Sequence, residues 1–538
     1  MDRDRPRLSG SGLLATVPLA FVGLFFVWPV ATVIAEGLTG AGVLEVLGDR
    51  RLQRVAWFTL WQAAVSTVLT IAVALPGAWA LARFRFRGRA VVWALITVPF
   101  VLPTVVVASA FVAVLGPRGP LGGPLGGLLP GVGAILAAHV YFNVAVVART
   151  VANALGQVDP QLEEAARSLG ASRWTAFREV SLPLVRPALV AAASIVFLFT
   201  FTSFGVVLLL GGPRRATIDV EIWRQVAYFL DLRTAAALAV VQLVAVVACL
   251  VVAGRMQARV VPRRARDAAR RPVGAERAVL AAILGPTLAF LVTPLAVVAY
   301  RSVDVGGGLG LTFYRALGTS RRGSSLFVPP EAAIRNSVTY AAIATAIALL
   351  VGGITAGLAA YRDRRTSRLL DLLVMVPLGT SAVTLGLGFL LALDEPPLDL
   401  RTWWGLVPIA HALIAAPFVV RIVVPALRSI DPRLREAAAV LGASPVRVRL
   451  AVDVPLASRA VLVAAGFAFA ISLGEFGATL FLARPDNPTM PIAIFRFLGQ
   501  PGPLNLGQAM AMSTLLMLVT ATVIAGIERF RAGSVGAF

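Results

Sequence analysis

The chain has no lysine: all 49 of its basic residues are arginines. An ATPase site of the P-loop type needs the lysine of G-x-x-x-x-G-K-[ST] to reach the β- and γ-phosphates. That motif is therefore excluded, and the glycine-rich stretch at 116–127, which prolines interrupt, is typical of a flexible turn. We expect this chain to hold no ATP or magnesium of its own.

Cysteine and histidine are also scarce. Cys249 is the only cysteine, so an intrachain disulfide is excluded. Two histidines, His139 and His411, are too few for a metal cluster, and the sequence contains neither HExxH nor CxxC. We expect both histidines to be packed or hydrogen-bonded between helices. No nucleophile–base arrangement clusters or repeats, so the sequence predicts neither a metal site nor an enzyme.

Charge is low as well, at 14% of residues, whereas 58% are hydrophobic and the mean hydropathy is +0.83. These values place the chain among membrane proteins that cross the bilayer many times. A spanning helix needs about 20 mainly apolar residues. The sequence predicts an all-α protein of about twelve such helices, at 13–35, 55–82, 90–115, 133–152, 187–211, 235–253, 279–300, 337–360, 369–393, 404–425, 460–482 and 508–527.

The arginines are distributed unevenly between the two sides of such a topology. A net charge of +22 would suggest nucleic acid in a soluble protein, but here the charge falls in short runs between apolar segments. With the N-terminus inside, 33 of the 49 arginines lie on the cytoplasmic side and 16 outside. Cytoplasmic arginine is the rule in membrane proteins. We therefore expect no nucleic-acid partner and both termini in the cytoplasm. The apolar run from Leu13 to about Ala35 is too long for a signal-peptide core, so we expect a first span that is retained rather than cleaved.

The sequence also repeats itself. At an offset of 272 residues, the segment at 159–183 matches that at 431–455, and His139 matches His411. Upstream the offset becomes 278. Six spans per half make the two copies face the same way, as a parallel repeat. The expected organisation is a first repeat at 1–253, a basic cytoplasmic linker at 254–277 whose arginines favour contact with anionic lipid headgroups, and a second repeat at 278–538.

The matching segments at 159–183 and 431–455 are polar and too short to span. Asp159 and Asp431 are good N-caps, each followed by a proline suited to the first helical position. Gly170 and Gly442 can end each helix in a left-handed conformation. The apolar stripe of each helix is mostly alanine. Such a helix could rest on the bilayer surface, but small residues favour close approach of another protein, once per half.

Both segments resemble the EAA motif of permeases in importers of the ATP-binding-cassette (ABC) type. The first copy reads "EAARSLGASRWTAFREVSLP" and the second "EAAAVLGASPVRVRLAVDVP". The resemblance implies two parallel six-helix permease repeats in a bacterial inner membrane, two copies of an ATPase subunit on the cytoplasmic side, and an extracytoplasmic solute-binding protein. Arg167 stands where the second copy has Ala439, so the two docking surfaces are not equivalent. The residues expected to couple to the ATPase are Glu164, Ala165, Ala166, Gly170, Pro183, Glu436, Ala437, Ala438, Gly442 and Pro455.

Further stretches indicate the solute. "LAAHVYFNVAVVARTVANAL" and "ISLGEFGATLFLARPDNPTMPIAIFRFLGQ" are similar to the fused permeases of thiamine importers, and ferric-iron permeases share this layout. An ionisable residue inside a span is a candidate functional site. Glu475, with its repeat mate Ser203 and the neighbouring Phe204 and Phe476, could line a pathway for a cationic solute such as thiamine. A hydrogen bond between packed helices is the other reading of Glu475.

A secondary transporter of twelve spans, driven by an ion gradient, is the alternative function. It would also consist of two parallel six-span halves. Such a transporter needs coupling-ion sites of its own and has no use for two docking helices. The expected spans carry few acids apart from Glu475, which weighs against proton coupling.

Overall fold

The computed structural model describes residues 10–40, 42–117, 119–257, 269–319, 326–361, 376–394 and 398–532. Nearly all of these residues are helical, and this part of the chain contains no β-strand. The helices form two compact units. Unit 1 consists of residues 1–39, 314–505 and 515–538, and unit 2 consists of residues 40–313 and 506–514.

Ten helices in the described ranges are long and apolar enough to cross a membrane. They overlap ten of the twelve expected spans, so the all-α membrane fold is confirmed. The spans expected at 187–211 and 460–482 are too long at their ends, because the helices stop at Phe201 and Gly474. The stretch expected as a span at 90–115 is instead a pair of helices bent by 104°, α5 (Arg89–Val101) and α6 (Thr104–Leu115). Pro103 lies at the bend and has no N–H to continue the helical ladder. The span expected at 369–393 falls partly outside the described residues; its described part contains α19 (Ala382–Ala392).

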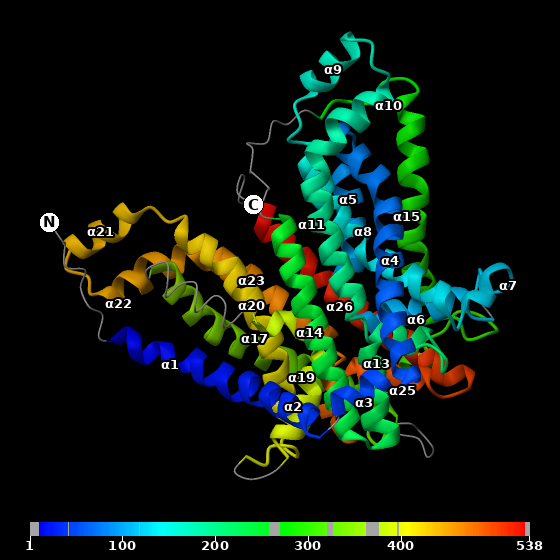
Figure 1. The fold of residues 1–538 in the computed structure, drawn as a ribbon, viewed down its shortest axis with the longest axis vertical. Coiled ribbons are helices and arrows are strands. Elements are labelled where there is room, and N and C mark those ends of the chain that lie inside the picture. Colours follow the sequence, from blue (N-terminus) through cyan, green and yellow to red (C-terminus); the bar gives the residue numbers. More distant parts are fainter. Residues whose placement is uncertain are drawn as a thin grey trace. The chain divides into compact units, whose positions relative to one another are not determined.

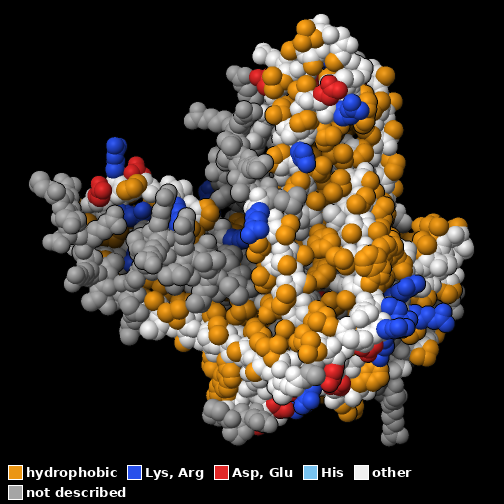
Figure 2. All heavy atoms as spheres, in the orientation of Figure 1, with side chains coloured by type: hydrophobic (Ala, Val, Ile, Leu, Met, Phe, Trp, Pro, Cys, Tyr) orange, Lys and Arg blue, Asp and Glu red, His pale blue; other side chains and the backbone are white. Residues whose placement is uncertain are grey.

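The core of unit 2 is a bundle of three long helices of the first repeat. Helices α4 (Arg50–Arg83), α8 (Val132–Leu155) and α11 (Leu182–Phe201) pack against one another. On the face seen in Figure 2, hydrophobic side chains cover the long flank of this bundle, as a lipid-facing surface requires. Besides α5, α6 and the helix at Glu276–Arg301, this unit contains α3 (Gly42–Gly48), α7 (Gly122–Leu125), α9 (Pro160–Ser168), α10 (Arg173–Ala176), α12 (Gly205–Leu210), α13 (Ile218–Arg224) and α14 (Leu232–Gln257).

Unit 1 has the same core, built from the second repeat. Its packed helices are α17 (Pro330–Tyr361), α20 (Leu406–Arg428) and α23 (Val454–Gly474). The remaining helices of the second half are α16 (Thr312–Arg315), α21 (Pro432–Val440), α22 (Pro445–Val448), α24 (Thr479–Leu482), α25 (Met490–Leu498) and α26 (Pro503–Ala532), the last of which contributes to both units.

The first span of each repeat packs on the core of the other repeat. Helix α15 (Glu276–Arg301) lies along α4, α5 and α6, and α1 (Gly10–Val22) lies along α17 (Figure 1). The hydroxyl of Tyr141 in α8 donates to the carbonyl of Leu291 in α15 at 2.9 Å. In unit 1, α2 (Trp28–Leu38) approaches α19 so closely that a Cβ on Gly388 would lie 3.0 Å from Pro29. The compact units therefore do not have the same membership as the sequence repeats.

Within unit 2, the segment expected to dock a partner lies at one end of the bundle. Figure 1 shows α9 and α10 at that end, beyond the ends of α4 and α15, while α3 and α13 lie at the opposite end. This placement keeps the polar helix α9 clear of the apolar flank.

Candidate functional site: the two EAA segments

The two EAA segments fold alike, beginning at the N-cap. The side chain of Asp159 accepts the N–H of Gln161 at 3.0 Å, and that of Asp431 accepts the N–H of Arg433 at 3.0 Å. Each aspartate thus satisfies one of the unpaired amides at the start of its helix, and a proline follows at the first helical position.

Both helices end at the expected glycine. Gly170 has φ +92° and Gly442 has φ +84°, in the left-handed region that a side chain rarely adopts. The following amide reaches back to the second alanine of EAA, with Ala171 N–H donating to Ala166 at 3.1 Å and Ala443 N–H donating to Ala438 at 3.0 Å. This is a Schellman closure. It turns the chain sharply toward the second short helix, α10 or α22.

The end of each motif contains a turn of π-helix. It covers Phe177–Ser181 in the first copy and Arg449–Asp453 in the second, immediately before α11 and α23. Pro183 and Pro455 lie at the start of the helix that follows and cannot donate a backbone hydrogen bond. In this wider turn, the N–H of the residue before each proline donates to the carbonyl five positions back, from Leu182 to Phe177 and from Val454 to Arg449. The π-helical turn thus leads into the helix that carries the proline of the motif in its first turn.

The EAA helices present their residues outward. Glu164, Ala165, Glu436 and Ala437 are exposed, and Ala166 and Ala438 are half-buried. The leucines at the helix ends, Leu169 and Leu441, are 90% and 87% exposed. Two large aliphatic side chains left in water beside small residues favour a surface that another protein covers.

Hydrogen bonds from Arg83 and Ser181 to Glu163, here called the first brace, join the first EAA helix to its bundle. Arg83 at the end of α4 donates to Glu163 at 3.0 Å, and Ser181 donates to the other oxygen of that carboxylate. Burial alone would raise the pKa of the Glu163 carboxyl, but hydrogen bonds from Ser181 and Arg83, with the charges of Arg83 and Arg167, hold this pKa below its ordinary value. The carboxylate therefore stays ionised and keeps the helix attached.

The second copy has a brace at the same positions with different chemistry. Arg435, the repeat mate of Glu163, donates through Nε to Asp453 at 2.7 Å and through Nη2 to the carbonyl of Leu427 at 2.8 Å. Asp453 is the repeat mate of Ser181 and is buried. Sequence reasoning missed both braces. The sequence did contain a signal for them: the residue just before EAA is charged in both copies, with opposite signs, as Glu163 and Arg435.

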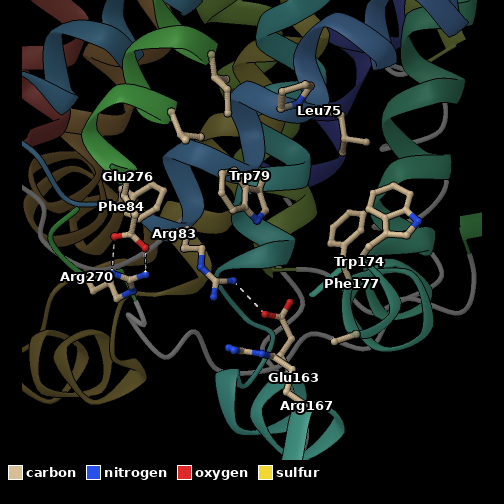
Figure 3. A pocket seen from close by; sticks show the side chains of 14 residues that line it. Leu75, Trp79, Arg83, Phe84, Glu163, Arg167, Trp174, Phe177, Arg270 and Glu276 are labelled. Atoms are coloured by element: carbon tan, nitrogen blue, oxygen red, sulfur yellow. Dashed lines mark hydrogen bonds and ion pairs between the residues drawn. The ribbon is translucent and has the colours of Figure 1, made fainter. Parts of the chain in front are cut away.

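A cavity of about 620 Å³ lies beside the first brace, between α9, the ends of α4 and α15, and the π-helical turn. Figure 3 shows Arg83 reaching from α4 to Glu163, and Arg270 clasping Glu276 at the start of α15. The side chains of Trp79, Trp174 and Phe177 form its aromatic walls.

The histidine of the first repeat is buried and hydrogen-bonded. His139 is 2% exposed; its Nδ1 lies 3.0 Å from the hydroxyl of Ser66 and its Nε2 lies 2.8 Å from that of Ser203. It thus connects α4 to the break between α11 and α12. Ser203, expected near a solute pathway, is one of its partners.

The second histidine holds Glu475 at the equivalent break. His411 Nε2 lies 3.3 Å from the carboxylate, and its Nδ1 lies 2.8 Å from the hydroxyl of Ser472. Glu475 also accepts the backbone N–H groups of Ala478 at 2.8 Å and Thr479 at 2.9 Å, and the Thr479 hydroxyl. The carboxylate therefore caps the short helix α24.

The phenylalanines beside these residues are buried too. Phe204 is 7% exposed, and Phe476 packs on Phe495 with ring centroids 5.5 Å apart. Ser203 and Phe204 belong to unit 2, whereas Glu475 and Phe476 belong to unit 1. The part these four residues play in a solute pathway stays a prediction.

Known proteins resemble the chain over nearly its whole length. It is 28% identical over 526 residues to the probable ABC transporter permease protein y4fN of Sinorhizobium fredii (strain NBRC 101917 / NGR234), covering 91% of this chain and 90% of that protein. It is 26% identical over 539 residues to the thiamine transport system permease protein ThiP of Salmonella typhimurium (strain LT2), covering 97% and 96%.

A solved chain was also found, from the crystal structure of a bacterial ABC transporter involved in the import of the acidic polysaccharide alginate. It is 19% identical with a TM-score of 0.40, covering 47% of this chain and 96% of that one.

The family whose description is "Binding-protein-dependent transport system inner membrane component" matches twice, at residues 74–266 and 348–530. Each match contains one EAA segment, which confirms the internal repeat. The chain belongs to this family and is a multi-pass inner-membrane permease of an ABC importer.

Proposed function

We propose that this chain forms the membrane pathway for thiamine or a similar organic cation, and that two separate ATPase subunits drive it by docking on the EAA segments. An extracytoplasmic binding protein delivers the solute, and both termini lie in the cytoplasm with the EAA segments. ATP and magnesium are bound by the ATPase.

The observation that carries the coupling half of the proposal is the match between the two EAA surfaces. Both copies expose the same glutamate and alanine, and each leaves a leucine almost fully exposed. Two surfaces that share these residues, although they differ at Arg167 and Ala439, are what a pair of identical subunits requires. The support for thiamine is the likeness to a permease of thiamine transport along 97% of the chain.

Uptake of radiolabelled thiamine tests the solute. The chain would be produced with its ATPase and binding protein, which we would seek first among the neighbouring genes, in cells that lack their own thiamine permease. We expect ATP-dependent uptake that excess unlabelled thiamine competes away. Uptake of ferric iron without uptake of thiamine would reject the organic cation, and uptake that follows an ion gradient without the ATPase would favour the secondary transporter.

Docking is tested separately. Leu169→Asp together with Leu441→Asp places a charge on each exposed surface, and we expect the ATPase to be lost from the purified complex. The matched control, Leu128→Asp, changes a leucine 37% exposed on the short turn after α7, away from both EAA segments. Retention of the ATPase by the double variant would contradict the docking surfaces.

A further inference from the structure

We infer that the cavity beside α9 binds one anionic phospholipid from the leaflet next to the EAA segments. The inference does not depend on which solute the permease carries.

The polar part of the cavity has an excess of positive charge. Its lining contains three arginines, Arg83, Arg167 and Arg270, against two carboxylates, Glu163 and Glu276, and therefore one unmatched positive charge. Glu163 pairs with Arg83 and Glu276 with Arg270. In the described part of the chain, Arg167 has no hydrogen bond or ion pair and acts on Glu163 only through space. A phosphodiester would give Arg167 a partner.

The apolar part of the cavity continues along two spanning helices. Leu75 lies eight residues before Arg83 on α4, and Ile283 lies seven residues after Glu276 on α15. At 1.5 Å per residue, these walls extend about 10 Å from the arginines into the membrane-crossing part of each helix. Val279 of the same wall is 47% exposed. A soluble phosphate would leave these walls in water, whereas acyl chains would cover them.

Aromatic rings separate the polar and apolar parts. Trp174 is 69% exposed at the mouth of the cavity. Trp79 lies on α4, and its ring centroid is 5.9 Å from the guanidinium of Arg83. Figure 3 shows Trp79 beside Arg83, and Trp174 across from it, next to Phe177. Tryptophan prefers the level of the lipid headgroups, and basic pockets between spanning helices are typical sites for anionic headgroups.

The linker contributes to the site as well. Arg270 is fixed in place by the backbone, because its N–H donates to Arg83 at 3.1 Å and its carbonyl accepts from Arg85 at 2.8 Å. Its guanidinium lies 5.5 Å from the ring centroid of Phe84. One arginine of the basic linker is therefore held at a defined position rather than spread over the bilayer surface.

The second repeat lacks the residues that build the site. Trp79 corresponds to Gly357, Trp174 to Val446 and Arg167 to Ala439. We therefore expect one bound lipid per chain rather than two.

Native mass spectrometry of the purified full chain tests this inference, with added phosphatidylglycerol or phosphatidylcholine of the same acyl chains. We expect one phosphatidylglycerol to be retained in preference to phosphatidylcholine. Arg167→Ala should lower that retention about five-fold, the effect of one arginine near an anionic surface. Trp174→Ala should lower it as well. The control Arg178→Ala, at an exposed arginine of the π-helical turn Phe177–Ser181 that pairs with Glu179 and does not line the cavity, should leave the retention unchanged.

Three results would overturn the inference. Equal retention of the two lipids would show that charge does not select the occupant. Equal loss in the Arg167 and Arg178 variants would show that the cavity is not the site. Thermal stabilisation by inorganic phosphate or glycerol 3-phosphate as large as that by phosphatidylglycerol would assign the arginines to a soluble anion. Melting temperatures of the variants without lipid check that each is folded.

Discussion

Glu163 and Arg435 occupy equivalent positions in the two halves of the permease, carry opposite charges, and perform the same task. Glu163 accepts from Ser181, and Arg435 donates to Asp453, the repeat mate of that serine. In each half the contact joins the EAA helix to the start of the span that follows it. The two halves have kept the contact while exchanging its chemistry.

The second brace should be costly to break. Arg435→Ala leaves Asp453 buried without its ion pair, which we expect to destabilise the protein by about 3 kcal/mol. The melting temperature of the solubilised protein measures the loss. Arg433→Ala, two residues earlier on the same helix and exposed, is the matched control. Arg435→Glu should lower the melting temperature further, and adding Asp453→Ser to it should restore part of the stability. If the double variant were no more stable than Arg435→Glu, the two braces would not be equivalent.

The first brace should depend on pH. The pKa of Glu163 is depressed, so its stabilising contribution is complete above the ordinary carboxyl pKa of about 4.3 and is lost as the pH falls through the lower folded-state value. We expect the melting temperature of Glu163→Gln to fall less on acidification than that of the wild type. Glu179→Gln, at an exposed pair, is the control. Parallel curves for wild type and Glu163→Gln would refute the brace.

The two glycine turns should be needed for coupling. A Cβ at Gly170 or Gly442 would meet no atom within 4 Å, so Gly→Ala costs only backbone strain, about 1–2 kcal/mol per site. Gly→Pro at both sites excludes the positive φ altogether and removes the glycine N–H, which donates to the carbonyl of Arg167 or Ala439. We expect transport to fall less in the alanine variants than in the proline variants, while the amount of permease inserted in the membrane stays normal. Full transport by the double proline variant would show that these segments do not couple.

Glu475→Gln separates anchoring from a pathway role. The carboxylate accepts two backbone N–H groups, and a glutamine would turn a second donor toward one of them. We expect a loss of about 1–3 kcal/mol in stability. Thiamine uptake per assembled complex then decides the pathway prediction: a further fall with unchanged basal ATPase activity supports it, and unchanged uptake removes Glu475 from the pathway. Ser203→Ala, which frees His139 of one partner, is the comparison in the other repeat.

The topology can be read by cysteine labelling. In a Cys249→Ser background, Ser168→Cys on α9 and Gly123→Cys on α7 place single exposed thiols at positions that we expect on opposite sides of the membrane. A membrane-impermeant maleimide added to intact cells should label Gly123→Cys alone. Labelling of both from outside would reverse the orientation of the EAA segment.

Much of the site could be predicted from the sequence because its signals are local. Asp159 and Gly170 act within a few residues of themselves, as cap and as left-handed turn, and both behave as expected. The same holds for the spans, which need only an unbroken apolar run. Where the run contained Pro103, length and composition alone could not show that the helix bends by 104° there.

By itself the sequence determined the membrane class, the repeat, the EAA helices and their caps, because hydropathy, spacing and N-cap chemistry are properties of neighbouring residues. Only the tertiary structure decided that α15 packs on the first repeat and α1 on the second, since the sequence of an apolar helix does not specify which helix it packs against. It also decided that Glu163 meets Arg83, 80 residues away, and that His411 holds Glu475. Such contacts depend on where folded helices bring distant side chains, which spacing along the chain does not encode.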